Sequence, residues 1–246
     1  ALPVHPFDNG DMDNRDENLE TWPREPGAIR QNIADYYGMV THLDNRIGDI
    51  LASLQARGLA ENTVVVYSAD HGIALGQHGL LGKQSRYEHS THVPLLMNGP
   101  GIEAGQRVAE LVWHGDTTAT LLELAGLDPR VATDGRSLTP ALRGEPLPEW
   151  RETIAGAYTF THRSVQDRRW KLIVNTVNPD YPNLRGTRGS DVVQLFDLEE
   201  DPWEQVNLAW DEDLAAVRDR LETALLTWQQ DAGDPALAQA FLPASG

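Results

Sequence analysis

Cysteine is absent from the 246 residues of this chain. The chain therefore encodes no disulfide, no zinc–thiolate site and no cysteine nucleophile. Basic residues are also few, since 20 Lys and Arg stand against 37 Asp and Glu, for a net charge of −17. This balance argues against nucleic acid and anionic membranes as partners, because both require a basic surface. An anionic small substrate is compatible with it, because a site can be locally positive in an acidic protein.

Long apolar runs are missing too. No run approaches the roughly 18 residues of a membrane span, and the start, ALPVHPFDNG, lacks the basic and apolar regions of a signal peptide. We therefore expect no membrane insertion. Because the first residue is Ala, we expect either processing or a piece of a longer protein. The length suits one large α/β domain, or one domain with a small second one.

The first part of the chain predicts an α/β fold. Residues 1–27 are polar and rich in Pro, Gly, Asp and Asn, which predicts an irregular loop. From Ala28 to Leu54 apolar residues recur at helical spacing, and Gly58 stands where a C′ glycine would end a helix. The β-branched run VVVYS at 64–68 is typical of strands buried on both faces of a parallel sheet. A helix followed by such a strand is half of a βαβ unit.

Further elements extend this pattern. The sequence predicts strands at 93–97, 153–159, 163–167, 170–176 and 192–198, a helix from about Asp116, as its N-cap, to Gly126, and a last helix at 214–228. For residues 1–150 we predict part of a mixed, mainly parallel sheet flanked by helices. For residues 151–246 we predict a small antiparallel subdomain with a terminal helix.

Residues with chemical potential gather in the stretch SADHGIALGQHGLLGKQSRYE, 68–88. Asp70 and His71 follow the VVVYS strand, and open α/β sheets bind ligands at the carboxyl ends of their strands. Carboxylate oxygen with imidazole nitrogen suits a divalent metal, and oxygen-rich surroundings favour Ca²⁺ or Mg²⁺. Two ligands are too few for a tight site, so we expect others from elsewhere in the fold or from a missing segment.

Lys83 follows in the glycine-flanked loop GLLGKQ. A lysine near a metal can bind an oxyanion such as sulfate or phosphate. Gln84 and Arg86 come directly after it, and with His78 they are candidates to face a substrate. Each of these residues also has an ordinary structural explanation, because a histidine between glycines can bond to backbone and a loop lysine is usually solvated. Their combination in one stretch favours a site.

Several segments resemble one protein family. ADHGIALGQHGLLGKQSRYEHSTHVPLLMNGPG resembles the second signature region of type I sulfatases, which belong to the alkaline phosphatase-like superfamily. Other segments similar to that family are ADYYGMVTHLDNRIGDIL, GDTTATLLELAG, DGRSLTPALRGE, RRWKLIVNT and QLFDLEEDPWEQVNLA. The resemblance covers about residues 28–230 and implies that the chain is the carboxyl-terminal half of a sulfatase.

The resemblance also implies roles for single residues. Asp70 and His71 would match two ligands of a catalytic calcium ion, with Mg²⁺ the less expected ion, and Lys83 would match a lysine that contacts the sulfate group. The nucleophile would be a formylglycine made from Cys or Ser in a C/S-x-P-x-R motif. Neither that motif nor the family's amino-terminal Asp-Asp pair occurs in this chain. We therefore expect both in a missing amino-terminal half.

The functional expectation is a metal-dependent sulfuric ester hydrolase acting on a small-molecule or saccharide sulfate. A carbohydrate sulfate is favoured, because GKQSRYEHS resembles bacterial sulfatases that act on sulfated sugars. By this hypothesis the isolated chain is inactive and the amino-terminal half is its partner. The first alternative is hydrolysis of phosphate mono- or diesters or of phosphonates, and the second is a non-catalytic binding module derived from a sulfatase. The resemblance also implies a periplasmic or extracellular location.

Overall fold

The computed structural model describes residues 10–20, 24–128, 133–176 and 192–234. The chain forms two compact units that interleave along the sequence. The first unit is assembled from Ala1–Gly38, Asp70–Val93 and Thr153–Gly246, and the second from Met39–Ala69 and Pro94–Glu152. The last change of unit follows Glu152, close to the predicted domain boundary at residue 150, which itself stays a prediction.

The helices and strands of the described ranges are η1 Asp11–Asp13, η2 Arg15–Leu19, α1 Pro26–Ala56, η3 Ala60–Asn62, β1 Val65–Ser68, η4 Gln77–Gly79, α2 Glu88–Thr91, β2 Leu95–Asn98, α3 His114–Leu124, α4 Thr139–Leu142, β3 Ile154–Tyr158, β4 His162–Gln166, β5 Trp170–Asn175, β6 Val192–Asp197, η6 Glu212–Leu214 and α5 Ala215–Ala232. Most ends agree with the predicted ranges to within two residues. The exception is α5, which continues past the predicted end until Gly233 adopts a left-handed conformation, with φ of 63°.

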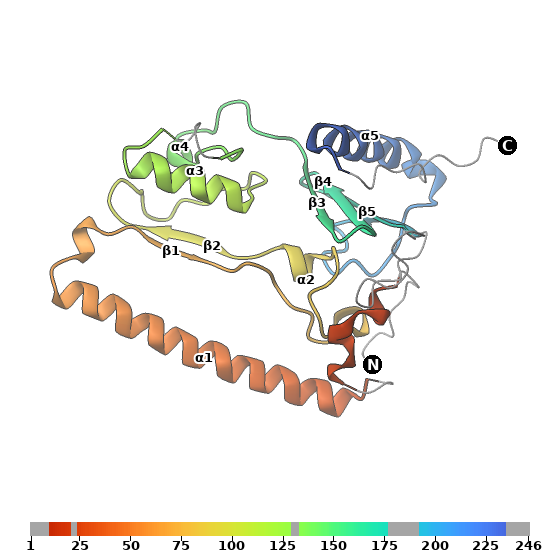
Figure 1. Ribbon diagram of the computed structural model, residues 1–246, viewed down its shortest axis with the longest axis horizontal. Helices are drawn as coiled ribbons and strands as arrows, with labels where there is room; N and C mark the ends of the chain where they lie inside the picture. The colour runs from red at the N-terminus through yellow and green to blue at the C-terminus, as the bar shows by residue number, and fades with distance from the viewer. Residues whose placement is uncertain (1–9, 21–23, 129–132, 177–191, 235–246) are drawn as a thin grey trace. The chain divides into compact units, whose positions relative to one another are not determined.

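A four-stranded antiparallel sheet in the order β3-β4-β5-β6 forms the centre of the first unit. Side chains alternate across β5, so that Leu172 and Val174 pack toward Leu221 and Leu225 of α5. In Figure 1, α5 lies across this face of the sheet. The predicted antiparallel subdomain with a terminal helix is confirmed.

The opposite face of the same sheet carries the loop that follows β1 in the chain. Ile173 of β5 and Phe196 of β6 pack against Ala74, Leu80 and Tyr87 in one buried cluster. Because β5 is buried on both faces, it supports the hydrophobic core on one side and the candidate site loop on the other. The predicted site residues therefore stand on a loop that is packed against a rigid sheet.

The second unit contains β1 and β2, which pair antiparallel with Val65 opposite Asn98 and Ser68 opposite Leu95. The α/β class is confirmed, and the strand pair that the described residues contribute to the predicted mixed sheet, β1 with β2, is an antiparallel one. Parallel neighbours require a crossover connection, usually a helix, whereas the segment between β1 and β2 contains only η4 and the four-residue α2. A two-stranded ladder cannot cover both of its faces, and Leu96 is 64% exposed.

Two local predictions are also corrected. Within the predicted loop at 1–27, residues 10–20 form the short helices η1 and η2, and 1–9 and 21–23 lie outside the described residues. Asp116 is the third residue of α3 and not its N-cap; its Oδ2 accepts a hydrogen bond from the backbone N–H of the N-cap, Trp113 (2.9 Å). An acidic side chain there serves the helix N-terminus as well as one at the cap itself. None of the described helices is long and apolar enough to cross a membrane.

Candidate active site

Asp70 and His71 present two ligand atoms to the same space. Asp70 Oδ2 lies 3.6 Å from His71 Nε2, and both side chains are accessible to solvent. His71 Nδ1 lies 2.8 Å from the carbonyl oxygen of Gly72. Because a carbonyl oxygen can only accept, Nδ1 carries a proton, and in the neutral ring Nε2 keeps its lone pair. That tautomer is the one that can bind a metal ion through Nε2.

This pair fits part of a metal site. Asp70 Oδ2 and His71 Nε2 are 3.6 Å apart. This is about the distance between two neighbouring ligand atoms that each bind one ion at about 2.1–2.5 Å. A carboxylate with a neutral imidazole is a donor set for a divalent cation. Across the described ranges no group of three or more His, Cys, Asp and Glu side chains could hold a metal ion. The residues therefore fit the two protein ligands that the sequence predicts and do not complete a coordination shell.

Backbone contacts hold the chain on both sides of the pair. In the first unit, the N–H of Gly72 donates to the carbonyl oxygen of Ser90 in α2 (2.9 Å). An added Cβ at Gly72 would collide with the carbonyl oxygen of His89, so glycine is needed here for close approach. In the second unit, His114 Nε2 lies 2.8 Å from the carbonyl oxygen of Ala69, to which it donates. The residues that flank the pair are thus each hydrogen-bonded within their own unit.

The loop that carries Lys83 closes on itself. The N–H of Ala74 donates to the carbonyl oxygen of Gly82 (2.9 Å), and inside this closure the N–H of Gly76 donates to that of Leu80 (2.9 Å). Gly76 adopts a φ of 103°, which a side chain would disfavour. Lys83 follows the closure directly and its side chain is exposed. Among the described residues, no hydrogen bond or ion pair joins Lys83 to Asp70 or His71.

A buried carboxylate that the sequence does not single out braces this loop. Glu17 Oε2 accepts from the N–H of Leu81 (2.9 Å), and Glu17 Oε1 accepts from the N–H of Gly82 (2.8 Å). Arg24 completes the cluster through an ion pair to Glu17 Oε2 (2.9 Å), with both side chains 4% exposed or less. Burial raises the pKa of Glu17, while the two amides and Arg24 act in the opposite direction.

Gln84 and Arg86 lie on the same loop and turn toward protein partners. Gln84 Oε1 accepts from the N–H of Asp16 (3.4 Å). Arg86 Nε donates to Ser164 Oγ of β4 (3.0 Å), and the guanidinium occupies space that a side chain at Gly156 would fill. Burial, followed by repulsion from a neighbouring arginine, lowers the pKa of Arg86 to about 10, so it stays charged at neutral pH. Their roles as substrate contacts stay predictions.

His78 is 3% exposed and has a structural role. Its Nε2 donates to the carbonyl oxygen of Glu204 (2.9 Å), and its ring stacks on Tyr87 with 4.2 Å between centroids. His78 also lines a pocket of about 290 Å³ together with Ile73, Gln77, Glu88, His89, His92, Pro202, Trp203 and Glu204. Asp70, His71 and Lys83 do not line this pocket. A contact between His78 and substrate therefore stays a prediction.

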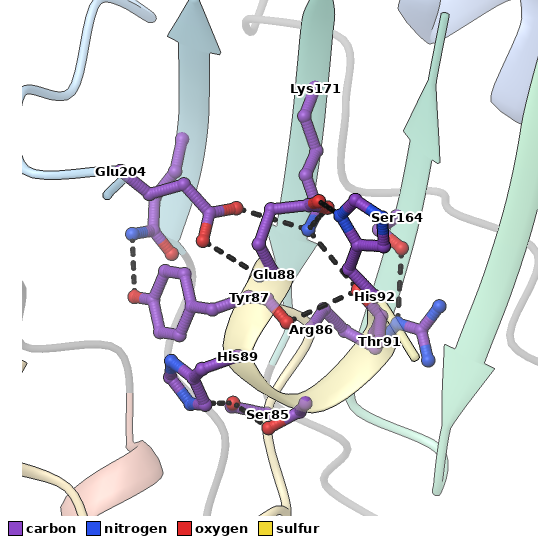
Figure 2. A network of polar contacts seen from close by, with 12 residues as sticks. Ser85, Arg86, Tyr87, Glu88, His89, Thr91, His92, Ser164, Lys171 and Glu204 are labelled. Carbon is purple, nitrogen blue, oxygen red and sulfur yellow. Dashed lines mark hydrogen bonds and ion pairs between the residues drawn. The ribbon is translucent and has the colours of Figure 1, made fainter. Parts of the chain in front are cut away.

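A buried lysine joins α2 to the sheet, and Figure 2 shows its surroundings. Lys171 of β5 has a fully buried side chain, and its Nζ lies 2.8 Å from Glu88 Oε1 and 3.0 Å from Glu204 Oε1. Glu204 Oε2 also accepts from the backbone N–H of Glu88 at the start of α2 (2.7 Å). His92 Nδ1 lies 2.8 Å from Glu88 Oε2 on the solvent side.

This cluster shifts the pKa values of its members. Burial raises the pKa of Glu88, but hydrogen bonds from His92 and Lys171 outweigh it and bring the value down to about 2. The hydrogen bond to Glu88 raises the pKa of His92. Burial raises the pKa of Glu204, against the attraction of Lys171. Glu88 is thus ionised at neutral pH and ties α2 to β5.

Sequence reasoning missed Glu17, Arg24, Lys171 and Glu204 as parts of this arrangement. One of them left a signal: Lys171 interrupts the apolar run WKLIVN, and a charge inside a strand that is buried on both faces requires a partner. Glu17 and Glu204 gave no such signal, because they stand in polar segments that are distant in sequence from the loop residues they bind. Glu17 lies in a stretch that the sequence predicts as an irregular loop.

Two family models match this chain. The family model described as Sulfatase matches residues 5–127, and the model described as N-sulphoglucosamine sulphohydrolase, C-terminal, matches residues 76–231. The chain is 32% identical over 186 residues to a choline-sulfatase of Rhizobium meliloti (strain 1021), a match that covers 74% of this chain and 34% of that protein.

Two solved structures share the fold. One is BT4656 in complex with its substrate D-glucosamine-2-N,6-O-disulfate, with a TM-score of 0.73 and 26% identity over 85% of this chain and 42% of that one. The other is the phosphonate monoester hydrolase of Agrobacterium radiobacter, with a TM-score of 0.68 and 28% identity over 80% of this chain and 40% of that one. The chain thus spans about a third of the curated relative's length and two fifths of these structures.

Proposed function

Because this chain belongs to the sulfatase family, we propose that the protein carrying it is a metal-dependent sulfuric ester hydrolase. The observation that carries the proposal is the pairing of Asp70 Oδ2 with Nε2 of His71, 3.6 Å apart, while Nδ1 of that ring donates to Gly72. An exposed lysine, Lys83, stands on the same loop. These residues supply two metal ligands and one cation for an oxyanion, which is part of the set that metal-assisted cleavage of a sulfate ester uses.

Each residue has a defined task in this proposal. A bound metal ion would supply charge stabilisation, and a formylglycine, whose C/S-x-P-x-R motif does not occur in this chain, would supply the nucleophile. Asp70 and His71 hold the ion, and the tautomer of His71 is set by its bond to Gly72. The Lys83 ammonium binds a sulfate oxygen and stabilises the negative charge that develops there in the transition state.

We propose Ca²⁺ as the ion, in preference to Mg²⁺. The support is the resemblance of Asp70 and His71 to calcium ligands of the family. Stripping the protein with a chelator and reloading it with one ion at a time tests this. Ca²⁺ should restore activity and raise the melting temperature at lower concentration than Mg²⁺ does. A reverse order would replace calcium in the proposal.

We propose a sulfated saccharide as the substrate class. The support is the fold shared with BT4656, whose structure holds a sulfated glucosamine. The competing substrate is choline sulfate, because the curated relative is a choline-sulfatase. Measuring kcat/KM on glucosamine 6-sulfate, choline sulfate and p-nitrophenyl sulfate separates the two. Turnover of choline sulfate above the sugar would overturn the saccharide assignment and leave the sulfatase proposal standing.

A second candidate is hydrolysis of phosphonate monoesters, because a phosphonate monoester hydrolase shares this fold. Lys83 and a metal ion would bind a phosphonate oxyanion by the same electrostatics as a sulfate. Comparing kcat/KM on p-nitrophenyl sulfate and on p-nitrophenyl phenylphosphonate distinguishes the two candidates. A higher value on the phosphonate would reverse their order, and turnover of neither would remove both.

Replacing Lys83 tests the site directly. In the full-length protein we expect Lys83→Ala to lower kcat about 100- to 1000-fold, since a transition-state charge loses its partner. Arg57→Ala, which also removes one exposed cation, is the matched control and should leave kcat unchanged. Lys83→Arg keeps the charge on a planar group of different shape and should recover only part of the loss. Unchanged kinetics in Lys83→Ala would remove this lysine from the site.

A further inference from the structure

We propose that Glu17 is a positioning residue for Lys83: its buried carboxylate, paired with Arg24, fixes the loop from which the lysine projects. The inference rests on the proposed function for the task of Lys83. It concerns a residue that lies 64 and 65 positions away in the chain from the amides it holds, Leu81 and Gly82. The proposed role of Glu17 is to position the loop, and it includes no contact with the substrate.

The first support is the geometry of the carboxylate. Its two oxygens receive separate backbone donors, Leu81 N–H on Oε2 and Gly82 N–H on Oε1, at 2.9 and 2.8 Å. These are the two residues directly before Lys83. Hydrogen bonds to an ionised acceptor are stronger and more directional than neutral ones. A carboxylate in this position therefore fixes both the place and the direction of the peptide units that lead into the lysine.

The second support is that the neighbouring peptide groups are tied as well. Arg24 Nε donates to the carbonyl oxygen of Gly79 (3.3 Å), and Asn14 Nδ2 donates to that of Gln84 (2.9 Å). The backbone is thus held at positions before and after Lys83, while the lysine side chain is exposed. That side chain has four flexible methylene groups and does not fix the ammonium by itself. The position of the backbone therefore sets the region that the ammonium can reach.

The third support is the cost of the arrangement. Burying the charges of Glu17 and Arg24 together is expensive, and an apolar pair could fill the same space. Gly82 is also constrained, because a Cβ there would lie 2.8 Å from Glu17 Oε1. What the charged pair provides, and an apolar pair would not, is two acceptors for the loop amides.

The experiment uses double-mutant cycles in the full-length protein. Glu17→Gln places an amide NH₂ against one of two N–H donors, and Gly82→Ala crowds the carboxylate from the loop side without changing any charge. We expect either change to lower kcat/KM on the preferred ester about 10- to 100-fold, since small misplacements near a reacting group have effects of this size. In a Lys83→Ala background the same changes should cost less than about threefold, because the group they position is gone.

Asp234→Asn is the matched control. It also breaks a buried carboxylate–arginine pair, with Arg163 at 2.6 and 2.8 Å, but this arginine belongs to β4 and not to the Lys83 loop. Its effect on kcat/KM should be the same in both backgrounds. If the Glu17→Gln and Gly82→Ala effects are also equal in both backgrounds, Glu17 supports only the fold and the inference is overturned.

A second readout does not depend on activity. Hydrogen exchange of the Leu81 and Gly82 amides should be slow in the wild type and at least about tenfold faster in Glu17→Gln and Gly82→Ala, since loss of a hydrogen bond of about 1.4 kcal/mol opens them by that factor. Exchange that stays unchanged overturns the inference whatever the activity. A wild type that hydrolyses neither sulfates nor phosphonates would instead overturn the proposed function. The exchange rates would in that case still show whether Glu17 holds the amides of Leu81 and Gly82.

Discussion

The chain contains two lysines, and their surroundings are opposite. Lys83 is exposed, and the two residues directly before it donate backbone hydrogen bonds to Glu17, which is paired with Arg24. Lys171 is fully buried in the middle of β5 between the carboxylates of Glu88 and Glu204. The ammonium of Lys83 is accessible to solvent or a ligand, while the backbone that leads to it is fixed. The ammonium of Lys171 is bound by protein side chains.

The difference shows how a single charge type can serve stability or chemistry according to what surrounds it. A buried lysine with two carboxylates has no capacity left for a ligand, and removing it leaves charge unpaired. An exposed lysine gains little from the fold and can give its charge to an incoming oxyanion. Substitutions at the two positions should therefore separate stability from activity.

The largest effect on stability is expected from Lys171→Met. The change leaves Glu88 and Glu204 without their cation in a buried position, and we expect a loss of about 3–5 kcal/mol in the free energy of unfolding. Urea denaturation followed by circular dichroism measures it. Arg46→Met, which breaks the exposed pair with Asp49, is the control and should cost much less. Equal losses would show that the Lys171 cluster is no more important than a surface pair.

A smaller effect, dependent on pH, is expected from Glu88→Gln. The pKa of Glu88 falls from a usual 4.5 to about 2, so its contribution to stability is full above about pH 4.5 and is lost as pH falls toward 2. The pKa of His92 is raised, so its part is full below 6.5 and is lost as pH rises through the higher value. The stability difference between wild type and Glu88→Gln should thus be greatest between about pH 4.5 and 6.5. A difference that is flat from pH 3 to 8 would contradict this.

The smallest effect on stability is expected from Lys83→Ala. Its exposed side chain contributes little to the fold, so the free energy of unfolding should stay within about 0.5 kcal/mol of the wild type. Reductive methylation followed by peptide mapping checks the same contrast without mutation. Lys83 should be modified under native conditions, and Lys171 only after unfolding. Modification of both lysines in the folded protein would contradict the contrast between an exposed Lys83 and a buried Lys171.

Elements with a strong period were predictable. The apolar repeat of α1, the β-branched strands of the carboxyl-terminal sheet and the left-handed glycines at 58 and 126 all follow from local rules. Local rules did not predict which strand pairs with which. The run VVVYS has the composition of a doubly buried strand, but its described neighbour is β2 alone, and Tyr67 is 38% exposed.

The site was predictable in its chemistry and not in its support. Asp70, His71 and Lys83 could be chosen because unusual residue types stand close together in one stretch. Glu17 and Glu204 could not, because each acts across a long separation and acidic residues are common in this chain. His78 illustrates the same limit, since a buried partner 126 positions away decides the direction of its ring.

Those long separations have a consequence for synthesis on the ribosome. Lys171 and Glu204 bind the Glu88 region from 83 and 116 positions further along the chain. At about 5–20 residues per second, the loop that carries Asp70 and Lys83 emerges roughly ten seconds before the sheet that must receive it. During that time the nascent loop lacks the sheet it packs against, so the candidate site is assembled only after β5 and Glu204 have been synthesised.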